Sequence, residues 1–157
     1  MPPGLTIRTG LTIRAGTAAD APALTAIFLA ARAGMTYLPA LHTDAETAWW
    51  MAHVVLAHGE VLVAESDGST VGFAALGPDR LDHLYVAPDA QRAGVGSALL
   101  AAAQGTRATL VLHVFDRNTE AVRFYRRHGF AVTGGSDGSG NEEGLPDLEM
   151  TWRAAGD

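Results

Sequence analysis

The chain of 157 residues contains no cysteine and no lysine. Without cysteine, the chain has no disulfides, no thiolate nucleophile and no cysteine-based metal site. Without lysine, Schiff-base chemistry through a lysine side chain is excluded. The sequence also has no apolar run long enough to cross a membrane, and no signal peptide with a charged start and an apolar centre. We therefore expect a cytoplasmic protein.

Positive charge is scarce, and all eleven basic residues are arginine, against seventeen acidic residues and a formal net charge of −6. This balance argues against nucleic acid and anionic membranes as partners. The length fits one domain with a substantial core, and 48% hydrophobic content is ordinary for a globular protein. The six histidines are scattered without metal-ligand spacing, so we expect no metal site.

The most informative segment is 84–103, LYVAPDAQRAGVGSALLAAA. A β-type run meets a turn with two glycines, and an apolar helical run then begins at Ser97. Such a turn directs free backbone N–H groups, and the positive end of the helix dipole, toward one point. Gly94 and Gly96 allow a phosphate to approach the backbone closely, and Arg92 adds a planar cation. The segment predicts a pyrophosphate site, although an unliganded tight turn has the same pattern.

The rest of the chain predicts an α/β domain on a mixed sheet. Strands are expected at 11–15, 60–65, 70–76, 81–86, 109–115, 130–133 and 147–153, and helices at 20–33, after Thr43, at 97–103 and at 119–128. Asp67-Gly68 predicts a hairpin, and Thr43 with Glu46 predicts a capping box. The second helix should place Trp49, Ala52, His53 and Leu56 on one face.

The N-terminus repeats the segment GLTIR, at 4–8 and at 10–14. We interpret the second copy as the first strand of the domain. The first copy is either an extra strand or a loose extension, and the sequence favours neither. We accordingly expect an N-terminal extension over 1–10, one domain over 11–153 and a tail over 154–157.

A second motif lies at 112–134, LHVFDRNTEAVRFYRRHGFAVTG. It predicts a strand, an Asn-capped helix with Phe-Tyr near its end, and Gly-Phe opening another strand. Together with LYVAP and QRAGVG upstream, it makes the chain resemble the GNAT family, the GCN5-related N-acetyltransferases that use acetyl-CoA. The resemblance covers roughly residues 11–153, and its most specific parts are Q/R-x-x-G-x-G/A and N-x-x-A-x-x-F-Y-x-x-x-G-F, both complete here.

The resemblance implies a single-domain GNAT-like fold, with a mixed, mostly antiparallel sheet splayed between the fourth and fifth strands and flanked by about four helices. It implies that the pantetheine arm of acetyl-CoA lies in that gap, bonded by the backbone of Tyr85 and Val86. It also implies that Asn118 contacts the cofactor from the other side. The cofactor-binding residues implied in this way are Leu84, Tyr85, Val86, Gln91, Arg92, Ala93, Gly94, Val95, Gly96, Ser97, Asn118, Ala121 and Tyr125.

Amide transfer from a thioester requires a neutral amine, stabilisation of an oxyanion and a proton for the leaving thiolate. The resemblance places Tyr125 beside the sulfur as the acid, and the N–H of Val86 or a neighbour near the oxyanion. The base is expected on strand 81–86. The first candidate is Asp82 and the second is His83, and a water chain without a protein base is the alternative. Strict alternation puts these two side chains on opposite faces, and a β-bulge would exchange the faces locally.

The resemblance implies that two loops line the acceptor site. The first contains Tyr37, Leu38 and His42, and the second, 136–146, contains Glu142 among several acidic residues. Charge of one sign near an open site favours a cationic amine, although a solvated loop has the same composition. We expect transfer to a primary amine of a small molecule or peptide by a monomer or homodimer. The alternatives are an acyl-CoA-binding module without catalysis and an unrelated phosphate-binding α/β domain.

Overall fold

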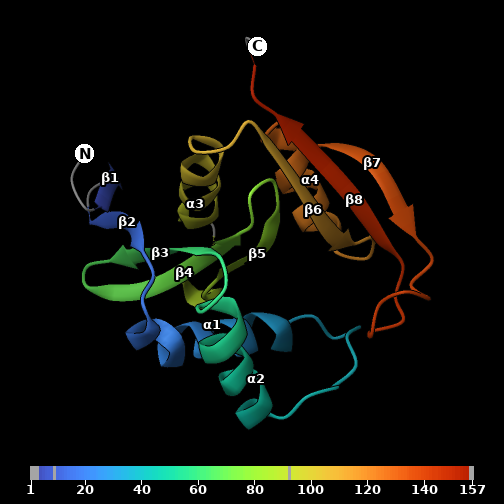
Figure 1. Ribbon diagram of the computed structural model, residues 1–157, viewed down its shortest axis with the longest axis horizontal. Coiled ribbons are helices and arrows are strands. Elements are labelled where there is room, and N and C mark those ends of the chain that lie inside the picture. Colours follow the sequence, from blue (N-terminus) through green and yellow to red (C-terminus); the bar gives the residue numbers. More distant parts are fainter. Residues whose placement is uncertain (1–3, 9, 92, 156–157) are drawn as a thin grey trace.

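The structure is a computed structural model that describes residues 4–8, 10–91 and 93–155. Its strands form a five-stranded sheet in the order β1-β2-β3-β4-β5 and a three-stranded sheet in the order β6-β8-β7 (Figure 1). The strands are β1 (Gly4–Arg8), β2 (Leu11–Ala15), β3 (Glu60–Ser66), β4 (Ser69–Leu76), β5 (Leu81–Val86), β6 (Thr109–Phe115), β7 (Ala131–Ser136) and β8 (Asp147–Arg153). The α-helices are α1 (Ala21–Ala33), α2 (Asp44–Trp50), α3 (Val95–Gln104) and α4 (Thr119–Arg127).

The local signals in the sequence predict most of these elements. Asp67 and Gly68 have φ of 50° and 83° and close the β3–β4 hairpin. Thr43 caps α2 in a capping box with Glu46. Helix α3 begins two residues earlier than expected, at Val95. The first GLTIR copy forms β1, which pairs antiparallel with β2 and extends the sheet.

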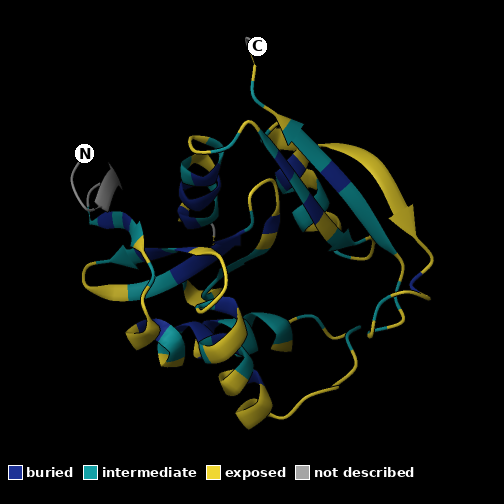
Figure 2. Cartoon of the chain, in the orientation of Figure 1, coloured by how far each residue is buried: buried dark blue, intermediate teal, exposed yellow. Residues whose placement is uncertain are grey.

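The five-stranded sheet separates two hydrophobic clusters (Figure 2). One face packs against α3, where Leu99, Leu100 and Ala103 are fully buried. The other face packs against α1 and the segment after α2, around Leu24, Met51 and Phe73. The cluster on the α3 side continues into the smaller sheet and α4, so one core joins the two sheets.

Trp49 and His53 share one face of the second helix as expected, with 4.9 Å between ring centroids, but this face is largely exposed. Trp49 is 61% exposed, and the residues that turn inward are Thr47, Met51 and Val55. Helix α2 continues directly into the π-helical turn η2 (Met51–Val55). Residues four apart lie one above the other on a helix, so this spacing forms the buried stripe. The contact with α1 and the sheet selects that stripe over the one occupied by Trp49.

Strands β5 and β6 meet at one end and separate at the other. A parallel bridge pairs Arg80 with Val111, whose N–H donates to the carbonyl of Asp79 at 2.8 Å. Beyond this bridge the two strands belong to different sheets. Counted from Leu11, they are the fourth and fifth strands, so the predicted splay and the predicted fold class are confirmed.

Among the residues that the structure describes, none of the helices combines the length and apolar character needed to span a bilayer. The cytoplasmic location and the domain boundaries expected from the sequence stay predictions.

Candidate active site

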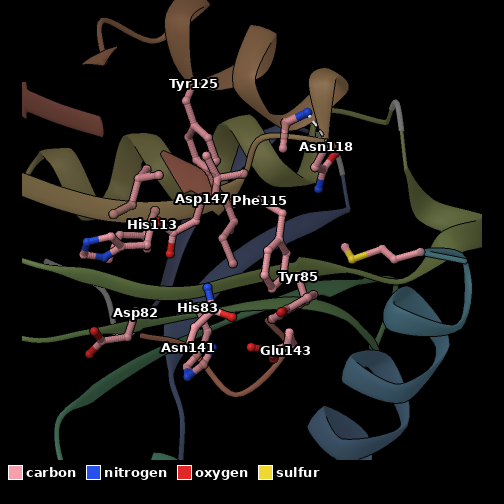
Figure 3. Close-up of a pocket in the computed structure, with 16 residues that line it drawn as sticks. Asp82, His83, Tyr85, His113, Phe115, Asn118, Tyr125, Asn141, Glu143 and Asp147 are labelled. Carbon is pink, nitrogen blue, oxygen red and sulfur yellow. Dashed lines mark hydrogen bonds between the residues drawn. The ribbon is translucent and has the colours of Figure 1, made fainter. Parts of the chain in front are cut away.

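A cavity of about 280 Å³ fills the space where β5 and β6 separate (Figure 3). Its two strand walls are residues 81–85 and 112–115. Helix α4 supplies a third wall, and the loops after α1 and before β8 close the fourth side. The site residues expected from the sequence that line this cavity are Asp82, His83, Leu84, Tyr85, Asn118, Ala121 and Tyr125.

Strand β5 contains the β-bulge that the sequence analysis allowed for. His83 pairs with Ala75 and Leu81 pairs with Leu76, so Asp82 is the additional residue. The bulge turns Leu81 to the same face as Leu84, where both contact the cluster on the α3 side. The Asp82 side chain is displaced to the rim, where it is 41% exposed and lies 3.2 Å from Nε of Arg80.

His83 points to the other face of the sheet, into a group of aromatic rings. Its ring lies 5.1 Å from the Trp50 ring, 6.4 Å from Phe28 and 6.3 Å from Tyr85, between centroids. Burial lowers the pKa of His83 below its usual 6.5, and the Arg32 cation lowers it further, while Asp82 acts in the opposite direction. His83 is therefore a neutral imidazole at pH 7 that can accept a proton.

The free edge of β5 provides backbone donors and acceptors to the cleft. The N–H of Ala87 donates to the carbonyl of Val71 at 2.8 Å, and hydrogen-bonded pairs alternate along an antiparallel ladder. This alternation directs the backbone of Tyr85 toward β4 and the backbones of Leu84 and Val86 toward the cleft. The expected backbone role of Tyr85 is therefore corrected to Leu84, and Tyr85 lines the cavity with its side chain.

The glycine-containing loop lies at the end of β5. Gly94 is the N-cap of α3 and has φ of 85°, which a residue with a side chain adopts at a cost. A Cβ atom at Gly96 would lie 3.4 Å from the Phe124 ring and 3.7 Å from Val86 Cγ2. The first N–H groups of a helix have no partner within it, so those of Val95, Gly96 and Ser97 can bind an anion.

The other expected loop residues are placed only in part. The Gln91 amide donates to the carbonyl of Val86 at 3.4 Å, which links the loop to β5. Ala93 is exposed, and its N–H donates to the carbonyl of Ala90. Arg92 lies outside the described residues.

Asn118 begins α4 at the opposite wall of the cleft. Its side-chain oxygen accepts a hydrogen bond from the N–H of Ala121 at 3.2 Å, which caps the helix as predicted. The amide nitrogen takes no part in the cap and remains available to a ligand. Ala121 is half-buried and lies one turn further along the same wall.

Tyr125 lies on this wall as well, 9% exposed and packed against Phe124 and Phe130. Burial raises the pKa of its phenol above the usual 10, and negative charge on Tyr85 would raise it further. Tyr125 therefore keeps its proton at neutral pH and presents a hydrogen-bond donor to the cavity.

Two ion pairs hold the second acceptor loop at the fourth side of the cavity, one to α1 and one to the first acceptor loop. Arg32 Nη2 lies 3.2 Å from Glu143 Oε2, and His42 Nε2 lies 3.0 Å from Glu142 Oε1. The Glu143 side chain is 15% exposed and lines the cavity, whereas Glu142 is 62% exposed and does not. Glu143 is thus the glutamate of this loop that faces the cavity, and the substrate-binding role expected of Glu142 and His42 stays a prediction.

Tyr37 and Leu38 do not line the cavity, although both belong to the loop above it. The Tyr37 ring packs against Phe115, with 6.2 Å between centroids, and under the guanidinium of Arg117. Its hydroxyl is buried without a hydrogen-bond partner in the described part of the chain. Leu38 is half-buried. Tyr37 therefore supports the wall of the site from behind through Phe115.

The lining also contains residues that the sequence did not single out as site residues, among them Met35, His113, Asn141, Glu143 and Asp147, although Asn141 and Glu143 belong to the predicted acceptor loop 136–146. His113 is the single polar residue inside the apolar run of β6, and this isolation was an available signal. The other four lie in or beside loops, and only the folded arrangement turns them inward. With Asp82, the lining contains three carboxylates, and arginines outside the lining pair with two of them.

Known proteins share this arrangement. Residues 57–132 match the model of the acetyltransferase (GNAT) domain. The solution structure of apo YjaB from Escherichia coli superposes with a TM-score of 0.75 at 28% identity, covering 90% of this chain and 97% of that one. The chain belongs to the GNAT family.

Two further similarities bear on the cofactor and the acceptor. The structure of yncA from Salmonella typhimurium, described with its cofactor acetyl-CoA, has a TM-score of 0.69 at 26% identity over 92% of this chain and 94% of that one. Peptidyl-lysine N-acetyltransferase YiaC from Escherichia coli is 35% identical over 98 residues, which are 62% of this chain and 66% of YiaC. The matched segments span about half to two thirds of the curated relatives' lengths.

Proposed function

We propose that this protein is an acetyl-CoA-dependent N-acetyltransferase that transfers an acetyl group to a primary amine. The observation that carries the proposal is the cleft between β5 and β6, closed at the Arg80–Val111 bridge and open beyond it. An extended, amide-containing ligand can enter this cleft and pair with the free edge of β5. The YjaB and yncA similarities support the same activity.

The residues present fit acetyl-CoA. Leu84 and Val86 present backbone N–H and C=O groups on the free edge of β5. The pantetheine arm of acetyl-CoA contains two amides, which can form hydrogen bonds with these groups. At the end of that edge, Gly96 leaves open the space that a Cβ would take beside Val86 and Phe124. The N-terminus of α3 lies at the same place and favours negative charge, as a pyrophosphate requires.

When bound, acetyl-CoA supplies an acetyl thioester, and the residues of this chain supply the rest. The N–H groups of Leu84 and Val86 are fixed donors for the negative charge that develops on the carbonyl oxygen. Tyr125 holds a proton in a dry environment and donates a hydrogen bond to the departing sulfur. Because burial raises its pKa, Tyr125 acts through this hydrogen bond and does not ionise beforehand.

His83 is the base that the geometry favours. Its imidazole is neutral at pH 7 and lines the cavity, so it can take the proton of an attacking amine. Asp82, the first expectation from the sequence, is exposed and paired with Arg80, which makes its carboxylate a weak proton acceptor. We assign Asp82 an electrostatic role at the rim.

The acceptor that the lining favours is a cationic amine on a flexible stem. Asp82, Glu143 and Asp147 lie in the lining, and Arg80 and Arg32 offset the charge of the first two, so Asp147 supplies the least compensated negative charge among the described residues. YiaC and YjaB are named peptidyl-lysine N-acetyltransferases, which supports the lysine side chain of a peptide as the acceptor.

Two measurements on the purified protein test the proposal. Acetyl-CoA should raise the melting temperature, because a ligand that binds only the folded state stabilises it. Gly96→Val should weaken this shift, corresponding to about tenfold lower affinity or about 1.4 kcal/mol. Gly140→Val is the matched control, since a Cβ there meets nothing within 4 Å.

The second measurement follows thiol release with a panel of primary amines and lysine peptides. Release that depends on both acetyl-CoA and an amine supports the transferase. A melting shift without release for any amine would instead indicate a non-catalytic acyl-CoA-binding module. No shift at all would contradict both.

A further inference from the structure

A second cavity, of about 340 Å³, lies on the other side of the start of β5. It is bounded by Trp50 of α2, by residues after it, and by the ends of β3 and β4 at the rim of the large sheet. Asp82 and His83 line both this cavity and the cleft. The two spaces therefore adjoin at the residues placed closest to the acceptor amine.

The inner lining of the second cavity is apolar. Val55 and Ala75 are each 6% exposed and Leu76 is 2% exposed, so they form a floor. Trp50 stands on one side, and Val54, 39% exposed, lies at the opening. Such a floor takes an uncharged, apolar group in preference to an ion.

The charged residues at the rim already have partners. Glu60 Oε1 lies 2.8 Å from Nη2 of Arg107, and Arg80 Nε lies 3.2 Å from Oδ1 of Asp82. These pairs leave little net charge at the opening to attract a second cation. The second cavity thus differs from the cleft by its apolar floor and by lacking Glu143 and Asp147, and it suits a different part of the same substrate.

We propose that the second cavity binds an apolar or aromatic side chain that neighbours the acceptor lysine in a peptide. The inference rests on the proposed transferase function and specifies its substrate. A lysine side chain reaches the cleft while the peptide backbone stays outside, and residues along an extended chain are about 3.3 Å apart, so a neighbouring side chain falls within reach. A small free amine would leave the cavity empty.

The test uses five-residue peptides with a central lysine, either with alanine at all other positions or with one phenylalanine at −2, −1, +1 or +2. For the wild type, we expect phenylalanine at one position to raise kcat/KM about tenfold, as filling one apolar pocket does. Binding of the same peptides in the presence of CoA, measured by fluorescence anisotropy, should show the same preference without turnover.

Val54→Trp fills the opening and should reduce the phenylalanine preference to about twofold or less. Val132→Trp is the matched control, because Val132 is similarly exposed, at 41%, and lies on β7. This control should keep the wild-type preference. Equal melting temperatures of the two variants establish that both fold.

Two outcomes overturn the inference while the proposed function stands: equal wild-type kcat/KM for all peptides, or a preference that persists in Val54→Trp. A wild type that acetylates no amine, yet binds the phenylalanine peptide better than the alanine peptide, contradicts the transferase function and leaves the subsite supported. A wild type with neither activity nor preference contradicts both.

Discussion

His83 stands edge-on to Trp50, with 5.1 Å between ring centroids and 89° between ring planes. This contact encloses an ionisable ring against an apolar one, and burial lowers the pKa of His83. Ordinary strand alternation places His83 on the same face as Tyr85, and the bulge at Asp82 changes only the direction of Leu81 and Asp82. Adjacent residues thus become an enclosed imidazole, which we propose as the base, and an exposed carboxylate.

The first prediction concerns the pH dependence of transfer. Neutral His83 is the proposed base and its pKa lies below 6.5, so kcat/KM should show an acid limb as pH drops through that lowered value. His83→Gln should reduce kcat at pH 7 about 100-fold and remove this acid limb. His53→Gln, at an exposed histidine packed against Trp49, is the control and should keep the wild-type kcat and the acid limb. An unchanged acid limb in His83→Gln would show that another group titrates.

The second prediction separates binding from chemistry at Tyr125. Tyr125→Phe removes only the hydroxyl, which is the donor to the leaving sulfur. We expect kcat to fall about 100-fold, with acetyl-CoA affinity and the melting temperature nearly unchanged. Steady-state kinetics and calorimetric titration measure the two quantities. A variant with the wild-type turnover number would refute the acid role.

The third prediction compares neighbouring glutamates. Glu143→Gln removes a carboxylate from the cavity and leaves Arg32 without that partner, so KM for a cationic amine should rise several-fold, about 1 kcal/mol in binding. Glu142→Gln alters an exposed residue outside the cavity lining and should leave KM within about twofold. Equal effects of the two substitutions would contradict this placement of the loop.

The fourth prediction concerns stability away from the cavity. Asp20 is 8% exposed and accepts from both terminal nitrogens of Arg14, at 2.7 and 2.9 Å. Asp20→Asn should lower the free energy of unfolding at pH 7 by about 2 kcal/mol in urea. Asp116→Asn, at an exposed site, is the control and should stay within about 0.5 kcal/mol of the wild type.

The ion pair between Arg14 and Asp20 also determines how the free energy of unfolding changes in acid. Arg14 holds the pKa of Asp20 below its usual 3.8. The ion pair therefore contributes its full stabilisation above pH 3.8, and this contribution is lost as pH falls through the lowered pKa of Asp20. The difference between wild type and Asp20→Asn should narrow below pH 3.8, and a difference that is constant with pH would contradict the ion pair.

The sequence by itself determined the order of the elements, the turn at Asp67-Gly68, the caps at Thr43 and Asn118, and the two motifs that indicate the GNAT family. These features depend on residues a few positions apart, so their physical causes lie within single segments. Backbone sterics, capping hydrogen bonds and hydrophobic periodicity act within these segments and do not depend on contacts with distant residues.

Only the tertiary structure decided which side chains the cavity contains. The pairing of β5 with β4 placed the bulge at Asp82, and packing against Trp50 enclosed His83. The ion pair between Arg32 and Glu143 joins residues 111 positions apart and turns Glu143 inward. Packing of α2 against α1 and the sheet exposed Trp49 and buried Met51. Each of these outcomes results from contacts between distant segments, which no local pattern specifies.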